Sequence, residues 1–77
     1  MQELINNIDK LHTTKLGYKR ISSNLCINED VIDYCKKIIL DNKSKIYIKG
    51  KNYYCENSNI RITINRRSYT IITAHML

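Results

Sequence analysis

Residues 60–65 read Ile-Arg-Ile-Thr-Ile-Asn, and this stretch decides the fold. Isoleucines alternate with polar residues at a period of two, which is typical of a β-strand that buries one face. Turn-forming residues stand on both sides of the stretch, Asn57-Ser58-Asn59 before it and Arg66-Arg67-Ser68 after it. The pattern therefore predicts a strand over 60–65 between two turns.

Short strands are also predicted before and after this one. Ile46 and Ile48 alternate with polar neighbours, residues 50–52 form a turn that begins with a glycine, and residues 53–55 predict a short strand. Residues 69–76 are rich in β-branched side chains and predict the last strand. Consecutive short strands joined by turns indicate an antiparallel meander of three to four strands.

The loop of the last hairpin determines which side chains share a face of the sheet. We predict a three-residue loop over 66–68, which pairs Asn65 with Tyr69 and Ile62 with Ile72. A two-residue loop is the alternative and would turn the last strand over, because a slip of one residue exchanges the two faces. A three-residue loop also favours a left-handed residue, and this loop has no glycine. The predicted register gathers on one face Arg61, Thr63, Asn65, Tyr69, Ile71, Thr73 and His75.

The first part of the chain predicts helices. Apolar residues within 4–11 fall on one helical face. A second helix begins after the caps Thr13 and Thr14 and continues from Lys15 to about Asn24.

A third helix begins at the N-cap Asn28, has acidic residues in its first turn and ends at Asp41-Asn42. Its buried stripe consists of Val31, Cys35, Ile38 and Ile39. Helices followed by hairpins predict an α+β fold, with N-terminal helices packed on a C-terminal antiparallel β-meander. We expect one domain over residues 1–77, with a helical half over 1–42 and a basic sheet half over 43–77.

The net charge of +6 is confined to the sheet half. Residues 1–42 hold six basic and six acidic residues, whereas residues 43–77 hold seven basic residues and one acid. Such asymmetry favours contact with a polyanion, and nucleic acid, RNA in particular, is the partner we expect. Two other interpretations are a sheet edge protected by lysines and an acidic protein partner.

Several classes of protein are not expected. Cys26, Cys35 and Cys55 include no Cys-x-x-Cys pair, which disfavours a disulfide framework and zinc and favours reduced thiols in the cytoplasm. No apolar run approaches the roughly 20 residues of a membrane span, and the N-terminus does not resemble a secretory signal. Carboxylates are not paired in the sheet half, and no glycine-rich phosphate loop is present, so we expect no metal and no cofactor.

The two histidines of the chain, His12 and His75, are the candidate acid and base of an RNA-cleaving site. Cleavage through the 2′-hydroxyl needs a base, an acid for the leaving oxygen and a cation at the phosphate, and histidine titrates near neutrality. Arg20 and Arg61 are the candidate phosphate ligands in this site, Lys51 is an alternative, and Tyr69 would position the substrate. The alternative interpretations are a helix-capping His12, an exposed terminal His75 and a solvated Arg20.

A wider set of residues is expected to contact nucleic acid. Cations would bind phosphates, and Tyr53, Tyr54 and Tyr69 would stack on bases. Because the chain has no Phe or Trp, at least half of its tyrosines should instead belong to the core. The expected contact residues are Lys49, Lys51, Arg61, Arg66, Arg67, Tyr53, Tyr69, Asn65 and Thr73.

The chain resembles a short bacterial family of unknown function through three stretches. These are His-Thr-Thr-Lys-Leu-Gly-Tyr-Lys-Arg-Ile at 12–21, Lys-Gly-Lys-Asn-Tyr-Tyr-Cys at 49–55 and Ser-Tyr-Thr-Ile-Ile-Thr-Ala-His at 68–75. The order of elements is also similar to that of the barnase–EndoU–colicin–RelE group of ribonucleases and toxins. That likeness implies a helical pair, His12 and Arg20, and a terminal-strand pair, Thr73 and His75.

Two functions compete on these observations. The first is a metal-independent endoribonuclease or toxin-like RNA-processing domain. The second is a non-catalytic binding module, such as an anti-CRISPR-like phage or mobile-element inhibitor of a host nucleoprotein complex. A third expectation, compatible with either function, is a homodimer formed by pairing of sheet edges, without any contact with a membrane.

Overall fold

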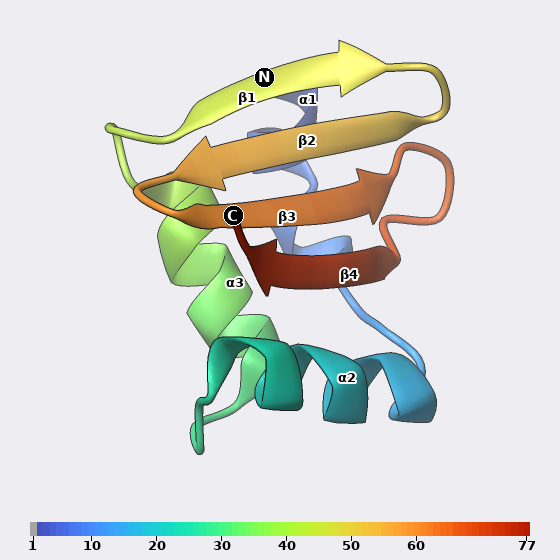
Figure 1. Ribbon diagram of the computed structural model, residues 1–77. Helices are drawn as coiled ribbons and strands as arrows, with labels where there is room; N and C mark the ends of the chain where they lie inside the picture. The colour runs from blue at the N-terminus through green and yellow to red at the C-terminus, as the bar shows by residue number, and fades with distance from the viewer. Residues whose placement is uncertain (1) are drawn as a thin grey trace.

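The computed structural model describes residues 2–77 and confirms the predicted α+β class, with helices first and strands second (Figure 1). The strands form one antiparallel sheet in the order β1-β2-β3-β4. The elements are α1 (Gln2–Asn6), the 3-10 helix η1 (Ile8–Lys10), α2 (Lys15–Leu25), α3 (Val31–Leu40), β1 (Lys45–Lys49), β2 (Asn52–Asn57), β3 (Ile60–Asn65) and β4 (Ile71–Met76).

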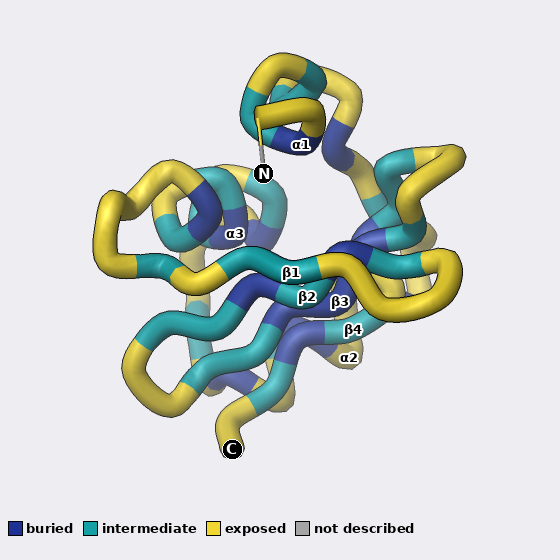
Figure 2. Tube along the Cα trace, turned by 90° about the horizontal axis from the view of Figure 1, so that it is seen from above, coloured by how far each residue is buried: buried dark blue, intermediate teal, exposed yellow. Residues whose placement is uncertain are grey.

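The helices leave one face of the sheet uncovered. Helices α1 and α3 lie behind the sheet and α2 runs alongside β4, as the two perpendicular views show (Figures 1 and 2). The covered face contributes apolar side chains to the core, among them Cys55, Ile62 and Ala74, which meet Ile21 and Ile39 from the helices. The opposite face, turned toward the viewer in Figure 1, carries no helix of the described chain.

The second helix begins and ends close to where the sequence predicts. The side-chain oxygen of Thr14 accepts a hydrogen bond from the Gly17 amide at 3.0 Å, which satisfies a free N–H of the first turn. Cys26 ends α2 in the left-handed conformation, with φ of 54°. Glycine usually occupies such a position because a Cβ atom is crowded there.

The other two helical predictions need correction. The single helix expected over 4–11 is divided into α1 and η1, and Asn7 lies between them. The N-cap of α3 is Asp30 rather than Asn28, and its carboxylate accepts from the Asp33 amide at 3.0 Å. The hydroxyl of Tyr18 accepts from the Val31 amide at 3.3 Å. The N–H groups of Val31 and Asp33, which have no partner within the helix, are thus both satisfied when α3 begins at Val31.

The predicted pairing of the last hairpin is wrong. The Asn65 amide donates to the Thr70 carbonyl, so the loop spans four residues, 66–69, and Tyr69 supplies the left-handed residue with φ of 58°. The Asn65 side chain holds the loop by accepting from the amides of Arg67 and Ser68 at 2.9 and 3.0 Å.

A β-bulge in β4 then changes the register. Ile64 pairs with Ile71, whereas Ile62 pairs with Ala74, so Ile72 is the extra residue of the bulge. Ile71 is therefore buried in the core, and Ile72 is 47% exposed, which reverses the expected placement of both residues.

The outer edge of β4 is closed by the segment that precedes α2. The backbone of His12 forms a parallel bridge with Thr70, and the Thr13 hydroxyl donates to the Ile71 carbonyl at 2.8 Å. At the other end of the strand, the side-chain amide of Asn24 donates from Nδ2 to the Ala74 carbonyl at 3.2 Å. These contacts occupy backbone groups that an edge strand would otherwise expose.

Candidate nucleic-acid interface

The uncovered face of the sheet presents three rows of cross-strand partners, which we call the open face. The predicted placement of Arg61, Thr63, Asn65, Thr73 and His75 on one face is confirmed by the ladder. In antiparallel strands, directly paired residues point to the same face. The rows are Lys45–Glu56–Arg61–His75, Tyr47–Tyr54–Thr63–Thr73 and Lys49–Asn52–Asn65.

The carboxylate of Glu56 is engaged by two neighbours on the open face. The Tyr47 hydroxyl donates to Oε2 at 2.7 Å, and Nε of Arg61 donates to the same oxygen at 3.0 Å. The Tyr47 hydrogen bond, opposed by partial desolvation and aided by Arg61, holds the pKa of Glu56 below its ordinary value. That hydrogen bond also raises the pKa of Tyr47. Glu56 is the one acid in the three rows, and its charge is matched by Arg61.

The middle row provides aromatic surface. The rings of Tyr47 and Tyr54 are stacked, with centroids 5.5 Å apart and planes inclined by 18°. Both side chains are half-buried, so part of each ring faces solvent. Lys45 and Lys49 lie on the same strand as Tyr47 and are exposed. An aromatic pair flanked by cations can contact bases and phosphates together.

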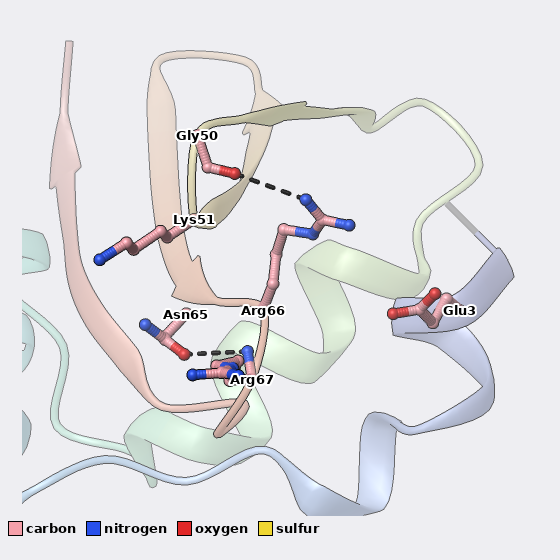
Figure 3. A pocket seen from close by; sticks show the side chains of 6 residues that line it. All are labelled: Glu3, Gly50, Lys51, Asn65, Arg66 and Arg67. Carbon is pink, nitrogen blue, oxygen red and sulfur yellow. Dashed lines mark hydrogen bonds between the residues drawn. The ribbon is translucent and has the colours of Figure 1, made fainter.

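A pocket of about 470 Å³ opens at the turn end of the sheet (Figure 3). Its lining combines the tips of two hairpins with one residue of α1. The Arg66 backbone amide donates to the Lys51 carbonyl at 2.9 Å, and Nη1 of Arg66 donates to the Gly50 carbonyl at 3.4 Å, which ties the hairpins together. The lining residues are Glu3, Gly50, Lys51, Asn65, Arg66 and Arg67.

Tyr53 and Tyr69, both expected to stack on bases, lie on the covered side of the sheet. Tyr53 has no exposed surface, and its ring stacks on Tyr69 with centroids 6.5 Å apart. The Arg66 guanidinium lies 5.8 Å from the Tyr53 ring centroid, and Lys10 lies 5.9 Å from that of Tyr69. Burial and a hydrogen bond to Glu3 raise the pKa of Tyr53 to about 12. Tyr53 is therefore a core residue in this structure.

The three residues predicted to be catalytic are not brought together. His75 pairs with Arg61 near the end of β4, whereas His12 contacts Thr70 before its start. His75 follows Thr70 by five positions along the strand, which corresponds to roughly 15 Å. Arg20 is exposed on α2. Among residues 2–77, no group of three or more His, Cys, Asp or Glu side chains is placed to hold a metal ion.

Most of the chain matches a known protein family. A model of a family described as proteins of unknown function, DUF3781, matches residues 5–75. This chain belongs to the DUF3781 family. Membership agrees with the family of unknown function that the sequence stretches indicate. No curated protein and no solved structure matches the chain, so the likeness to barnase-type ribonucleases stays a prediction.

Lys45 and Tyr47 of this DUF3781 member lie on the open face but were not among the expected contacts, whereas Tyr54 was expected to stack on bases alongside Tyr53. Adjacent strand residues point to opposite faces, so Tyr53 and Tyr54 cannot both be exposed. Because Cys55 and Tyr53 share the buried face, Tyr54 must belong to the open one. The same alternation places Tyr47 opposite the isoleucines of β1, a signal that the sequence already carries.

Proposed function

We propose that the open face binds single-stranded nucleic acid, with RNA favoured. The observation that carries this proposal is the coincidence of an uncovered sheet face with a stacked tyrosine pair and surrounding cations. Single-stranded nucleic acid exposes bases that can stack on aromatic side chains, whereas the bases of a duplex are already stacked on each other.

The charges of the open face support this ligand. Lys45, Lys49 and Arg61 face solvent beside the tyrosines, and the acid in the rows, Glu56, is paired with Arg61. The face therefore attracts phosphates without a free carboxylate to repel them. The half-buried Thr73 continues the row of the tyrosines, beyond Thr63, which is only 6% exposed. A ribose or base edge on this row would meet polar groups rather than an apolar patch.

Metal-independent RNA cleavage is the second candidate, and one observation favours it. His75 and Arg61 are direct cross-strand partners on the open face, so an imidazole shares this face with a guanidinium that could contact a phosphate. Cleavage needs both an acid and a base, and His12 lies at the far end of β4. The geometry thus favours binding over catalysis, and a single experiment can separate them.

Cytoplasmic location is part of the proposal. The thiols of Cys26, Cys35 and Cys55 are all free, as in proteins of reducing compartments. Burial raises the pKa of the Cys35 thiol to about 12, so this side chain is an unreactive part of the core. None of the helices in residues 2–77 has the length and apolar character needed to cross a membrane.

The decisive experiment measures fluorescence anisotropy of labelled RNA of about ten nucleotides, in EDTA and at about 50 mM salt. Tyr54→Leu keeps an apolar side chain but removes the ring, and we expect it to weaken binding about tenfold. Tyr34→Leu, on α3 and away from the face, is the matched control, because the Tyr34 hydroxyl makes no hydrogen bond within residues 2–77, and it should bind as the wild type does. Equal affinity of Tyr54→Leu and wild type would refute the proposal.

The same samples, separated on a denaturing gel, report on cleavage. The binding proposal expects intact RNA after incubation with the wild-type protein in EDTA. Cleavage that persists in EDTA and is lost in His75→Ala would instead establish the ribonuclease.

A further inference from the structure

We propose that the pocket at the turn end of the sheet binds a terminal phosphate monoester of the nucleic acid on the open face. This inference rests on the function proposed above and names the part of the ligand that this pocket selects. Three properties of the residues that line the pocket support it: their charge, the lack of side-chain partners for two of the cations within residues 2–77, and their position next to the open face (Figure 3).

The charge of the pocket matches a monoester better than a phosphodiester. Lys51, Arg66 and Arg67 supply three cations, and Glu3 supplies one carboxylate, which leaves two positive charges uncompensated. A phosphate monoester carries about −1.5 to −2 charges at neutral pH. A phosphodiester within a strand carries a single charge and would leave one cation unmatched.

Two of the cations are free to bind a ligand. Within residues 2–77, neither Nζ of Lys51 nor the guanidinium of Arg67 takes part in a hydrogen bond or an ion pair. Arg66, in contrast, is held in place by the Gly50 carbonyl and by the ring of Tyr53. One cation is thus preorganised, and two can close on the ligand from the hairpin tips.

Glu3 restricts the pocket to a phosphate at the end of a nucleic-acid strand. Its Oε1 accepts the Tyr53 hydroxyl at 2.7 Å, so the carboxylate is anchored to the core. The fixed negative charge of Glu3 repels a second phosphate. A nucleic-acid strand that passed through the pocket would bring a second phosphate close to this charge. The pocket therefore suits a phosphate that ends a chain.

The position of the pocket makes it continuous with the open face. Asn65 lines the pocket and also belongs to the last row of the open face, together with Lys49 and Asn52. That row lies two residues along β1 from Tyr47, which corresponds to about 7 Å. A terminal nucleotide can thus place its phosphate in the pocket while its neighbours extend toward the stacked tyrosines.

The test compares three RNAs of one sequence that carry a 5′-phosphate, a 3′-phosphate or no terminal phosphate. We expect one of the phosphorylated ends to bind about tenfold more tightly than the unphosphorylated RNA. The preference should diminish below about pH 6, where the monoester takes up a proton. The double variant Lys51→Gln/Arg67→Gln should bind all three RNAs alike, and Lys36→Gln/Lys37→Gln on α3 should behave as the wild type.

Equal binding of the three RNAs to the wild-type protein would overturn the pocket proposal and leave binding by the open face intact. Failure to bind any of them would overturn the proposed function. In that case adenosine 5′-monophosphate, titrated while amide NMR shifts are followed, tests the pocket by itself. Shifts at Lys51 and Arg67 that disappear in the double variant would support the pocket, and no shifts would overturn it as well.

Discussion

His12 and Thr70 are joined through both main chain and side chain. They form a parallel backbone bridge, in which the Ile71 amide donates to the His12 carbonyl at 2.7 Å. Nε2 of His12 also lies 3.1 Å from the Thr70 hydroxyl, and Nδ1 lies 2.8 Å from the Lys10 carbonyl, which can only accept. Both ring nitrogens are therefore engaged within the fold, and Nδ1 carries a proton.

His12→Ala should lower the free energy of unfolding by about 1 kcal/mol, because two hydrogen bonds of the ring are lost. RNA binding by the open face should not change. Denaturant unfolding of His12→Ala, Thr70→Val and the double variant measures the coupling between the two side chains. A variant that unfolds like the wild type but loses RNA cleavage would assign His12 a catalytic role instead.

Gly17→Ala should destabilise the protein, although alanine is favoured over glycine by about 1 kcal/mol within a helix. A Cβ at Gly17 would collide with the Thr13 hydroxyl and would approach that of Thr14 to 3.1 Å. The Thr13 hydroxyl is bound to the Ile71 carbonyl, so it cannot move without breaking that contact with β4.

Thermal unfolding of Gly17→Ala, alone and in a Thr13→Ala background, measures this effect. Because the smaller Thr13→Ala side chain makes room, the cost of Gly17→Ala should shrink or reverse there. An equal cost in both backgrounds would contradict the proposed collision.

Stability should fall as pH is lowered through the titration of Glu56. Its pKa in the folded protein lies below the unfolded value of about 4.3, so ionisation of Glu56 favours the folded state. The contribution is complete above about pH 4.3 and is lost as pH falls through the lower, folded pKa. Glu56→Gln should therefore flatten the pH dependence of unfolding in this range, whereas Glu29→Gln, at an exposed ion pair with Lys37, should change it little.

Binding to single-stranded RNA should weaken with salt in proportion to the number of phosphates contacted. Each contact contributes about −0.7 to the slope of log affinity against log salt concentration. Lys49→Gln should therefore make the slope shallower by about 0.7. Lys37→Gln, on α3, provides the control, and an unchanged slope for Lys49→Gln would exclude Lys49 from the interface.

Cys26→Gly should stabilise the protein by about 1 kcal/mol. Cys26 occupies the left-handed conformation at the end of α2, where a side chain adds strain that glycine avoids. Cys26→Ala keeps the strain and serves as the control. If chemical denaturation gives Cys26→Gly a free energy of unfolding no higher than that of Cys26→Ala, the strain at this position is small.

Local patterns were sufficient for most of the fold. The alternation in 60–65 and the Thr14 cap are properties of short stretches, and both appear in the structure as the sequence predicts. The bulge at Ile72 is different, because it depends on the four-residue loop and on the core that receives Ile71. The alternation of apolar and polar residues along the sequence does not reveal such contacts between distant parts of the chain.

The candidate site was predicted only in part for the same reason. Arg61 lies on β3, whereas Thr73 and His75 lie on β4, so their shared face depends on the register between the two strands. The predicted face is correct although the predicted pairs are not, because the extra residue of the loop and the extra residue of the bulge together restore the alternation. Tyr53 and Tyr54 are chemically identical, and the covering helices decide which of them is exposed. Residue type alone could not make that choice.

The closure of β4 by His12, Thr13 and Asn24 has a consequence for self-association. The sheet has two outer strands, and on the outer side of β4 the Ile71 backbone and the Ala74 carbonyl already have partners within the chain, while α2 packs along the same strand. We therefore expect edge-to-edge pairing of two copies to use β1 on both partners, about a two-fold axis. Such a pair leaves only the partly occupied β4 edges outside, which favours a closed pair over growth into a fibre.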